Sequence, residues 1–229
     1  MVASIPELVN RVYGSDIAAA DASSMILTLT LKDSAAINDY CLEQSSVCEK
    51  IAHAADTRIN CKHPDQYLLE YIAAMQMVGA PPGILKLKIG ARYMIIKNMF
   101  QGVFNGVRCK LLSFAGNMCL FVKLLSGPCN GTTVLLPKCI FTIASEASGL
   151  PFVVRRRQFP LIPAFAVTVH KAQGQTLQRV GLFISTPIFT HGQLYTALSR
   201  SRSWSNVFIY STLPNADLIH NCVYRHVLC

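Results

Sequence analysis

The stretch AFAVTVHKAQGQTLQRVGLFISTPIFTHGQLYTALSRSR, residues 164–202, decides the fold that this sequence predicts. Residues 164–169 form a short apolar, β-branched run that is typical of a strand buried on both faces. A polar turn over residues 170–175 follows directly, and residues 180–184 repeat the apolar pattern. Two such strands predict an open α/β sheet that presents ligand-binding groups at the carboxyl ends of its strands.

A helix is expected after the second of these strands. Thr190 and Gln193 have the spacing of a capping box, in which a hydroxyl and an amide satisfy backbone N–H groups at a helix start. The residues that follow predict a helix carrying Arg200 and Arg202 near its C-terminal end.

The pattern before this stretch changes from α/β to all-β and back. We expect a strand over residues 25–30 and helices over 6–13, 34–48 (capped by Asp33) and 66–78, with irregular chain at 49–63. Short apolar runs separated by turn residues predict a small closed barrel between residues 84 and 145. The predicted division is therefore 1–84 and 151–229 for the α/β part, with 85–150 as an inserted β-barrel.

Charge is unevenly distributed along the chain. Residues 1–85 hold ten carboxylates and five Lys or Arg, a net charge of −5. Residues 86–229 hold sixteen Lys or Arg and two carboxylates, a net charge of +14. A segment this cationic suits phosphate-rich partners such as nucleic acids. A merely soluble basic surface is the alternative, because composition alone is not specific.

Several kinds of chemistry are excluded by residues that the sequence lacks. Between residues 86 and 216, Glu146 is the sole carboxylate, so paired-carboxylate catalysis and a carboxylate-held Mg²⁺ site are not expected there. No glycine precedes a lysine, so the chain has no GxxxxGK[ST] phosphate loop. The nine cysteines form no CxxC pair and predict neither a zinc site nor a disulfide framework. With no secretory signal or membrane span predicted, we expect a reducing, intracellular location.

Two motifs carry a family resemblance. HKAQGQTL (170–177) followed by GQLYTALSRSRS (192–203) resembles motifs V and VI of superfamily-1 DNA helicases, in particular the petite-integration-frequency (PIF) type and the related helicases of Helitron transposons. RRRQFPLIPAFAVTVHKAQGQTL (155–177) is similar to that family throughout, and LKLKIGARYMIIKN (85–98) with FNG (104–106) is similar to its barrel insertion.

The resemblance implies a 5′-to-3′ ATP-dependent helicase motor with two RecA-like domains. This chain is similar only to the second, called 2A, interrupted by a small SH3-like barrel called 2B. The first domain, which carries the Walker A and Walker B motifs, has no counterpart here. We therefore expect ATP and Mg²⁺ to bind only when an N-terminal helicase half is supplied in trans, and we expect the chain alone to be inactive.

The resemblance also places residues at a nucleotide site. Arg200, in ALSR, stands at the arginine-finger position, where a guanidinium neutralises charge on the transferred γ-phosphoryl group. An arginine that offsets a helix dipole is the bland alternative. Gly174, Gln175 and Thr176 match the part of motif V that faces the nucleotide.

Other residues of the motifs are candidates for contacts with single-stranded DNA. The hydroxyl, amide, imidazole and ammonium groups at the strand end match the DNA-facing part of motif V and suit phosphates without reading bases: Thr168, His170, Lys171 and Gln173. Lys32, in TLTLKDSAAIN (28–38), stands at the basic position of motif IV.

Three consecutive arginines precede the deciding stretch. Arg155 and Arg157 are candidates to follow a nucleic-acid backbone, and a solvated edge strand is an equal alternative. Alternation along a strand sends Arg156 to the opposite face.

The predicted function is the C-terminal part of a DNA helicase acting in replication, repair, recombination or transposition, in a nucleus or in a viral or transposon context. The alternatives are a non-enzymatic module that binds single-stranded nucleic acid and a decayed transposon or viral fragment. Single-stranded DNA is the predicted partner, and no membrane is expected.

Overall fold

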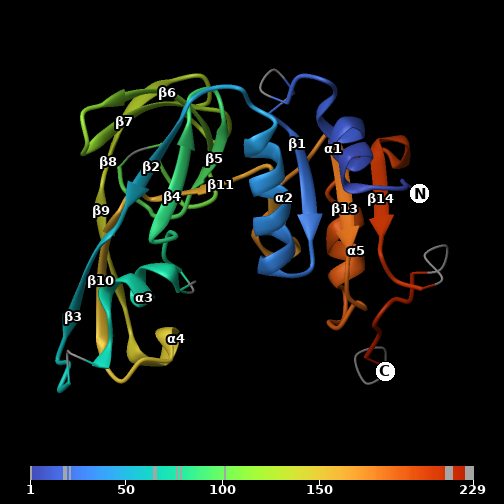
Figure 1. Cartoon of the computed structure of the whole chain (residues 1–229). Helices are drawn as coiled ribbons and strands as arrows, with labels where there is room; N and C mark the ends of the chain where they lie inside the picture. Colours follow the sequence, from blue (N-terminus) through green and yellow to red (C-terminus); the bar gives the residue numbers. More distant parts are fainter. Residues whose placement is uncertain are drawn as a thin grey trace. The chain divides into compact units, whose positions relative to one another are not determined.

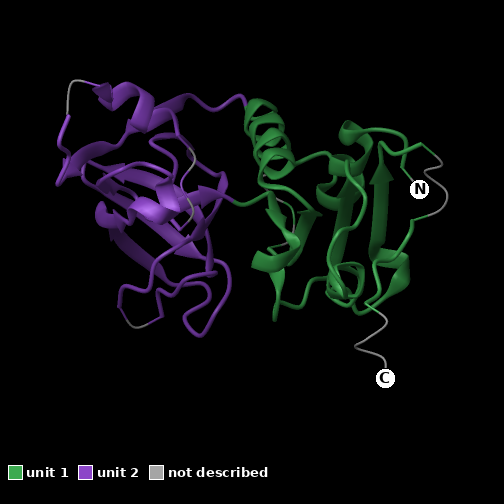
Figure 2. Cartoon of the chain, turned by 90° about the horizontal axis from the view of Figure 1, so that it is seen from below, with its two compact units in different colours: residues 1–45, 164–229 green, residues 46–163 purple. Residues whose placement is uncertain are grey.

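The structure, a computed structural model, describes residues 2–17, 20, 22–63, 66–75, 77, 79–100, 102–214 and 219–224. The chain divides into two compact units, which Figure 2 colours separately. Unit 1 comprises residues Met1–Ser45 and Ala164–Cys229, and unit 2 is the intervening segment Ser46–Pro163.

A parallel sheet forms the centre of unit 1 (Figure 1). Its strand order is β12 (Ala166–Thr168), β1 (Ser24–Thr28), β13 (Arg179–Ile184) and β14 (Val207–Ser211). The residues of β1 and β12 are all buried, as the apolar runs predict, because a parallel sheet is covered on both faces. The predicted strands of the deciding stretch are thus confirmed.

Helix α1 (Ile5–Tyr13) packs closely on this sheet. The Ser4 side chain caps its start by accepting from the Glu7 N–H at 3.3 Å, and Pro6 stands in the first turn. The helix lies against strand β13 at Gly181, where an added Cβ would come within 2.8 Å of the Val12 side chain. A glycine is needed there because the helix approaches the strand too closely for a side chain.

Helix α2 (Leu31–Glu43) begins earlier than the sequence predicts. Thr30, not Asp33, is the N-cap, and its hydroxyl oxygen accepts from the Asp33 N–H at 3.1 Å. The Asp33 carboxylate in the first turn accepts instead from the Thr30 and Ser185 hydroxyls. The expected cap at Asp33 is wrong, because a hydroxyl three residues earlier already satisfies the helix start.

Unit 2 is built mainly of antiparallel strands in several sheets. One sheet has the order β11 (Leu161–Pro163), β5 (Arg92–Ile95), β6 (Arg108–Ala115), β7 (Cys119–Leu124) and β8 (Thr133–Pro137). A second has the order β3 (Ala55–Ile59), β10 (Val153–Gln158) and β9 (Cys139–Ile143), and a third pairs β2 (Glu49–His53) with β4 (Ile84–Lys88). Two short α-helices, α3 (Leu69–Ala74) and α4 (Ser145–Ser148), also belong to this unit.

The prediction of irregular chain at residues 49–63 is wrong, because β2 and β3 lie there. Their partners are β4 and β10, which are distant in sequence. This pairing places residues 46–84 and 151–163 in unit 2, whereas the division at 84/85 and 150/151 came from local pattern alone and stays a prediction about domains.

A buried ion pair ties β3 to β10 in unit 2. The guanidinium of Arg156 holds both carboxylate oxygens of Asp56, with Nε–Oδ1 and Nη2–Oδ2 distances of 2.9 Å. It also donates to the carbonyls of Pro81 at 3.0 Å and Ile72 at 2.7 Å. The Arg156 side chain is fully buried, so the prediction that it leaves its neighbours' face is confirmed.

None of the described helices has the length and hydropathy that crossing a bilayer requires.

Candidate functional site

The parallel sheet of unit 1 delivers the motif residues to one edge. Strands β1, β12 and β13 end at Thr28, Thr168 and Ile184, and parallel strands place their carboxyl ends at the same side of the sheet. Strand β12 leads into the 3₁₀ helix η2 (Val169–Ala172), and β13 leads towards α5 (Gln193–Leu198). We call this side of unit 1 the ligand edge.

The turn after η2 is held by its own backbone. The Gln173 N–H donates to the His170 carbonyl at 3.3 Å, and the Gln175 N–H donates to the Ala172 carbonyl at 3.1 Å. Gly174 between them has a φ of 78°, in the left-handed region that favours glycine. A side chain with a Cβ would be strained at this position of the turn.

Arg200 joins the two motifs physically. Its Nη1 donates to the Gln175 carbonyl at 3.2 Å, and its Nε donates to the Thr196 carbonyl at 2.8 Å. The Leu177 N–H in turn donates to the Arg200 carbonyl at 2.9 Å, and Leu177 forms a parallel bridge with Ser201. Motif V and the end of motif VI thus lie against each other, 25 residues apart in sequence.

The other motif V residues differ in exposure. Thr168 is buried at the strand end, whereas His170, Lys171, Gln173 and Thr176 are exposed. Partial desolvation lowers the pKa of the Lys171 ammonium from its ordinary value. Within the described part of the chain this ammonium has no carboxylate partner.

Lys32 reaches the same edge along a different strand. It stands in the first turn of α2, directly after β1, and its side chain is exposed. Arg155 and Arg157 lie elsewhere, on β10 of unit 2, so they do not share the sheet that carries the motifs.

Gln193 does not take part in the capping box that its spacing predicts. The residue before α5 is Gly192, with a φ of 73°, and no side chain caps the helix, so the expected capping box of Thr190 and Gln193 is wrong. The Gln193 side chain is only 4% exposed, and neither end of its amide has a hydrogen-bond partner. The side-chain oxygens of Gln175 and Thr186, in the same unit, are also buried without a partner. A buried polar atom of this kind costs free energy unless something satisfies it.

Asn38 is a supporting residue that the sequence does not single out. Its side-chain amide donates to the Ala166 carbonyl at 2.8 Å. Its oxygen accepts from the N–H groups of Phe165 at 2.9 Å and Ala166 at 2.8 Å. Tyr13 binds the Phe165 carbonyl from the other helix. These contacts fix the start of β12, whose other end carries the turn of motif V.

The remaining chemistry of the site is limited. No group of three or more His, Cys, Asp or Glu is placed to hold a metal ion among the residues that the structure describes. The edge offers hydroxyl, amide, imidazole and cationic groups, all of which can bind phosphate oxygens.

Comparison with known proteins points to one family. No family model matches the chain. The ATP-dependent DNA helicase Pif1 of Campylobacter jejuni is 32% identical over 179 residues, which cover 75% of this chain and 38% of that protein. The Pif1 helicase from Candida albicans has a similar fold, with a TM-score of 0.70 and 24% identity over 98% of this chain and 52% of that one.

A second solved structure, Pif1 helicase from Bacteroides in complex with ADP-AlF3 and ssDNA, has a TM-score of 0.64 and 20% identity. It matches 98% of this chain and 49% of its own. The chain therefore spans about half the length of the solved structures that it matches, and less than two fifths of the Campylobacter relative. Its mixed α/β fold, with a parallel sheet and antiparallel sheets, is that of part of a Pif1 helicase.

Proposed function

This chain fits a fragment of a Pif1-type DNA helicase, and from that premise we propose that it is the C-terminal part of an ATP-dependent 5′-to-3′ helicase motor. The observation that carries the proposal is the hydrogen bond from Arg200 to the Gln175 carbonyl. It brings a guanidinium from motif VI against the glycine turn of motif V at the carboxyl edge of a parallel sheet, where such folds bind ligands.

Arg200 is suited to a phosphoryl group as well as to this structural contact. A guanidinium has five N–H donors, and three of them bind the Thr196 carbonyl, the Gln175 carbonyl and the Ser199 hydroxyl. The two that remain are held in a fixed orientation by the others. In the complete motor they would neutralise charge on the γ-phosphate of ATP, with Gly174, Gln175 and Thr176 lining the same rim.

A phosphate loop of the usual kind would hold ATP, and the printed sequence contains none. Glu146 is the only carboxylate between residues 86 and 216. In this proposal the donors at the ligand edge contact the outer side of a bound nucleotide, and a second helicase half supplies the phosphate cradle. The unsatisfied amide of Gln193 is consistent with an edge that another domain completes.

Single-stranded DNA is the second ligand of the proposed motor. Lys32 and Lys171 would neutralise phosphates, and Thr168, His170 and Gln173 would donate or accept hydrogen bonds along the strand. These residues follow β1 and β12, two paired strands with the same direction. In this proposal unit 1 corresponds to the RecA-like domain 2A, and the antiparallel strands of unit 2 include the SH3-like barrel 2B.

The test is reconstitution of ATP hydrolysis. The purified chain is assayed with single-stranded DNA, alone and with an N-terminal half of a Pif1-type helicase that carries the phosphate loop. We expect turnover only with both halves, and Arg200→Ala should lower it roughly 10³-fold. Arg202→Ala, which removes a nearby exposed arginine, is the control and should keep turnover within about twofold.

Two results would contradict the proposal. Turnover by the pure chain would show that it holds ATP without a second half. Equal turnover by the Arg200→Ala and parent chains in the reconstituted motor would contradict the assignment of Arg200 as the arginine finger. DNA binding without any turnover, whichever half is added, would favour the alternative of a non-enzymatic binding module.

A further inference from the structure

The positive charge of this chain belongs to unit 2. Residues 46–163 contain fourteen Lys or Arg and five carboxylates, a net charge of +9, whereas unit 1 contains seven of each. The carboxylates of unit 2 stand at positions 49, 56, 65, 70 and 146, so none lies on a strand of the sheet β11-β5-β6-β7-β8. The segments that join β5 to β6, β6 to β7 and β7 to β8 contain none either. This part of unit 2 therefore carries cations without carboxylates.

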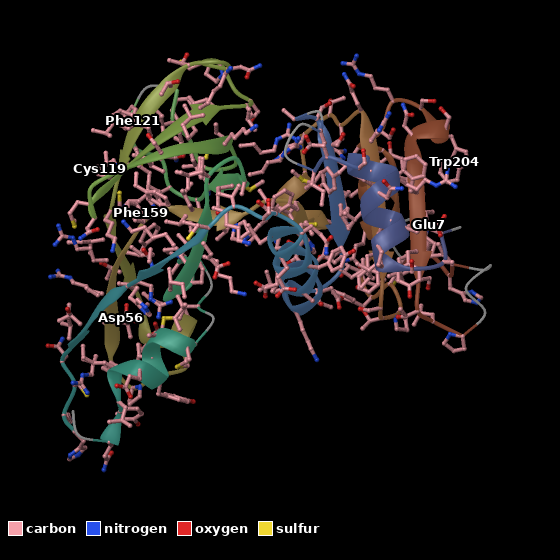
Figure 3. All side chains as sticks on the ribbon, turned by 45° about the horizontal axis from the view of Figure 1, so that its top comes forward. Glu7, Asp56, Cys119, Phe121, Phe159 and Trp204 are labelled. Carbon is pink, nitrogen blue, oxygen red and sulfur yellow. The ribbon has the colours of Figure 1, made fainter. Side chains whose placement is uncertain are left out.

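The outer side of β6, β7 and β8 exposes apolar side chains. Phe121 on β7 is 41% exposed, whereas its neighbours on either side along the strand are fully buried (Figure 3 labels Phe121). Leu135 on β8 stands opposite Phe121 in the register and is 46% exposed. Leu112, next to the β6 residue that pairs with Phe121, is 37% exposed. Three large apolar side chains thus lie on the solvent side of three paired strands, and such a cluster indicates an interaction site.

Lys123 adds positive charge to the same side. It stands two residues after Phe121 and is exposed, so the two side chains share a face of β7. The register places Lys110 of β6 directly opposite Lys123, and like charges in that position repel each other. Lys123 forms no ion pair with any residue that the structure describes. We call the side formed by Leu112, Phe121, Lys123 and Leu135 the Phe121 face.

Strand β8 leaves one main-chain edge open. It is the last strand in its sheet, and among the described strands it pairs with β7 alone. The Lys138 N–H donates to the Met118 carbonyl at 2.9 Å, and hydrogen-bonded pairs alternate along antiparallel strands. The even-numbered residues of β8 therefore bond to β7, whereas Thr133 and Leu135 turn their N–H and C=O groups to the open edge. Pro137, which has no N–H, stands on the same side, where a proline is tolerated.

We propose that β8 accepts a strand from an acidic partner protein, in which an aliphatic side chain and a carboxylate stand two residues apart. The strand adds antiparallel, as the other pairs of this sheet are, and its main chain bonds to Thr133 and Leu135. Its aliphatic side chain packs beside Leu135 on the Phe121 face. Its carboxylate, opposite Thr133, starts two strand spacings from Lys123, roughly 10 Å, which a lysine and a glutamate side chain span together.

Charge and geometry favour this occupant over two others. A second copy of the chain would bring its own Lys123 and a unit of charge +9 to the same face, so cations would oppose cations. A nucleic acid has no peptide groups that continue a β-ladder, and Leu112 and Leu135 stand on either side of the ring on which a base would stack. The Phe121 face lies wholly in unit 2, so it is separate from the ligand edge of unit 1.

The test uses the full chain and a fluorescein-labelled ten-residue peptide. Every second residue of this glutamate peptide is threonine, and the others are valine and glutamate in turn, so valine and glutamate share one face of an extended strand. A lysine peptide, with lysine in place of glutamate, is the charge control. Binding is measured by fluorescence anisotropy, and exchange of the Thr133 and Leu135 amides is followed by NMR.

The variants separate the main chain from the side chains. Leu135→Pro removes an N–H at the open edge and leaves the ladder with β7 in place, whereas Leu135→Thr keeps that N–H. Lys123→Thr removes the charge, and Lys62→Thr, at an exposed position after β3, is its matched control. Thermal melting followed by circular dichroism shows whether each variant is folded.

We expect Leu135→Pro to bind the glutamate peptide about tenfold more weakly, and Leu135→Thr about threefold. Lys123→Thr should lose about threefold, whereas Lys62→Thr should stay close to the parent chain. The lysine peptide should bind about tenfold more weakly than the glutamate peptide. The bound glutamate peptide should also slow exchange of the Thr133 and Leu135 amides.

N-methylated peptides test the pairing without any change in the protein. The valine and glutamate residues lie opposite Thr133 and Leu135, so their N–H groups face β8, and methylating those nitrogens should abolish binding. The threonine N–H groups face away from β8, and methylating them should leave binding within about threefold. This pair of peptides keeps the test decisive even when Leu135→Pro does not fold.

Four outcomes would overturn the proposal. Equal binding of the glutamate and lysine peptides would remove the charge complementarity, and equal effects of the two methylation patterns would exclude strand pairing. Self-association of the chain that a folded Leu135→Pro abolishes would assign the edge to a second copy. Oligothymidine binding that falls as far as peptide binding in Lys123→Thr and Leu135→Thr would assign the face to nucleic acid.

Discussion

The two compact units differ in where their polar and charged residues lie. Unit 1 has no net charge, and its informative groups stand at the ends of parallel strands, where Arg200 meets Gln175. Unit 2 carries a net charge of +9. Arg156 forms a buried ion pair with Asp56, whereas its neighbours Arg155 and Arg157 are exposed on a sheet face. Unit 1 therefore concentrates its polar groups at the ligand edge. Unit 2 combines a buried ion pair with exposed cations on a sheet face.

Three consecutive arginines of unit 2 show how burial changes what a charge does. Arg156 is enclosed by a carboxylate and two carbonyls, so its charge serves the fold. Among the residues that the structure describes, the exposed side chains of Arg155 and Arg157 form no ion pair, so their charge faces solvent. Net charge alone would treat the three as equal.

The largest effect is expected from Asp56→Asn in unit 2. It leaves the buried Arg156 guanidinium without its carboxylate, and breaking a buried pair costs roughly 3–5 kcal/mol. The measurement is chemical denaturation followed by circular dichroism. Arg155→Met is the control, because an exposed side chain that forms no ion pair with any described residue should change stability by less than about 0.5 kcal/mol.

The reactivity of one buried thiol in each unit shows separately how readily each unit opens in this variant. Burial raises the pKa of Cys41 in unit 1 to about 12, and burial also raises the pKa of Cys109 in unit 2. Both thiols should therefore react slowly with a disulfide reagent at pH 8 until their unit opens. Asp56→Asn should accelerate Cys109 more than Cys41. Equal acceleration would show that the two units unfold together, and an unchanged Cys109 rate would contradict the role of the ion pair.

The next effect is expected from Asn38→Ala in unit 1. This change leaves two N–H groups and one carbonyl at the start of β12 without their partner, which costs about 2–3 kcal/mol. Here Cys41 should become reactive before Cys109. Oligothymidine binding should weaken as well, because β12 positions the motif V turn. Ser34→Ala on the same helix is the comparison, since its hydroxyl donates to the nearby Leu31 carbonyl. Equal losses for the two variants would contradict a special role of Asn38.

The smallest effect concerns Lys171. Partial desolvation lowers its pKa, so it loses its proton at a lower pH than an exposed lysine does. Binding of oligothymidine should therefore weaken a few-fold between pH 7 and pH 9.5 in the parent chain. Lys171→Arg keeps its charge over that range and should show a flatter profile. Identical pH profiles for the parent chain and Lys171→Arg would contradict a contact between Lys171 and the single strand.

Local sequence pattern predicted the strands of unit 1 because each is a short apolar run that is buried on both faces. It also predicted the inward turn of Arg156, since alternation along a strand fixes which face a side chain takes. Strands β2 and β3 were missed because most of their residues are exposed, and their pairing with β4 and β10 depends on chain far away in sequence.

The candidate site shows the same limit. Arg200 and the motif V turn were found by their motifs, yet their hydrogen bond could not be read from two segments 25 residues apart. Gln193 was assigned to a cap because spacing records distance along the chain and not the direction set by Gly192. The role of Asn38 could not be predicted, because its partners are backbone groups more than 120 residues away.

The central claim is that unit 1 holds the single strand at the ends of β1 and β12. Oligothymidine in which bromodeoxyuridine replaces part of the thymidine can be photo-cross-linked to the chain and the linked peptides identified by mass spectrometry. The account predicts cross-links on the peptides that contain residues 168–176 and Lys32. Cross-links confined to residues 46–163 would contradict it.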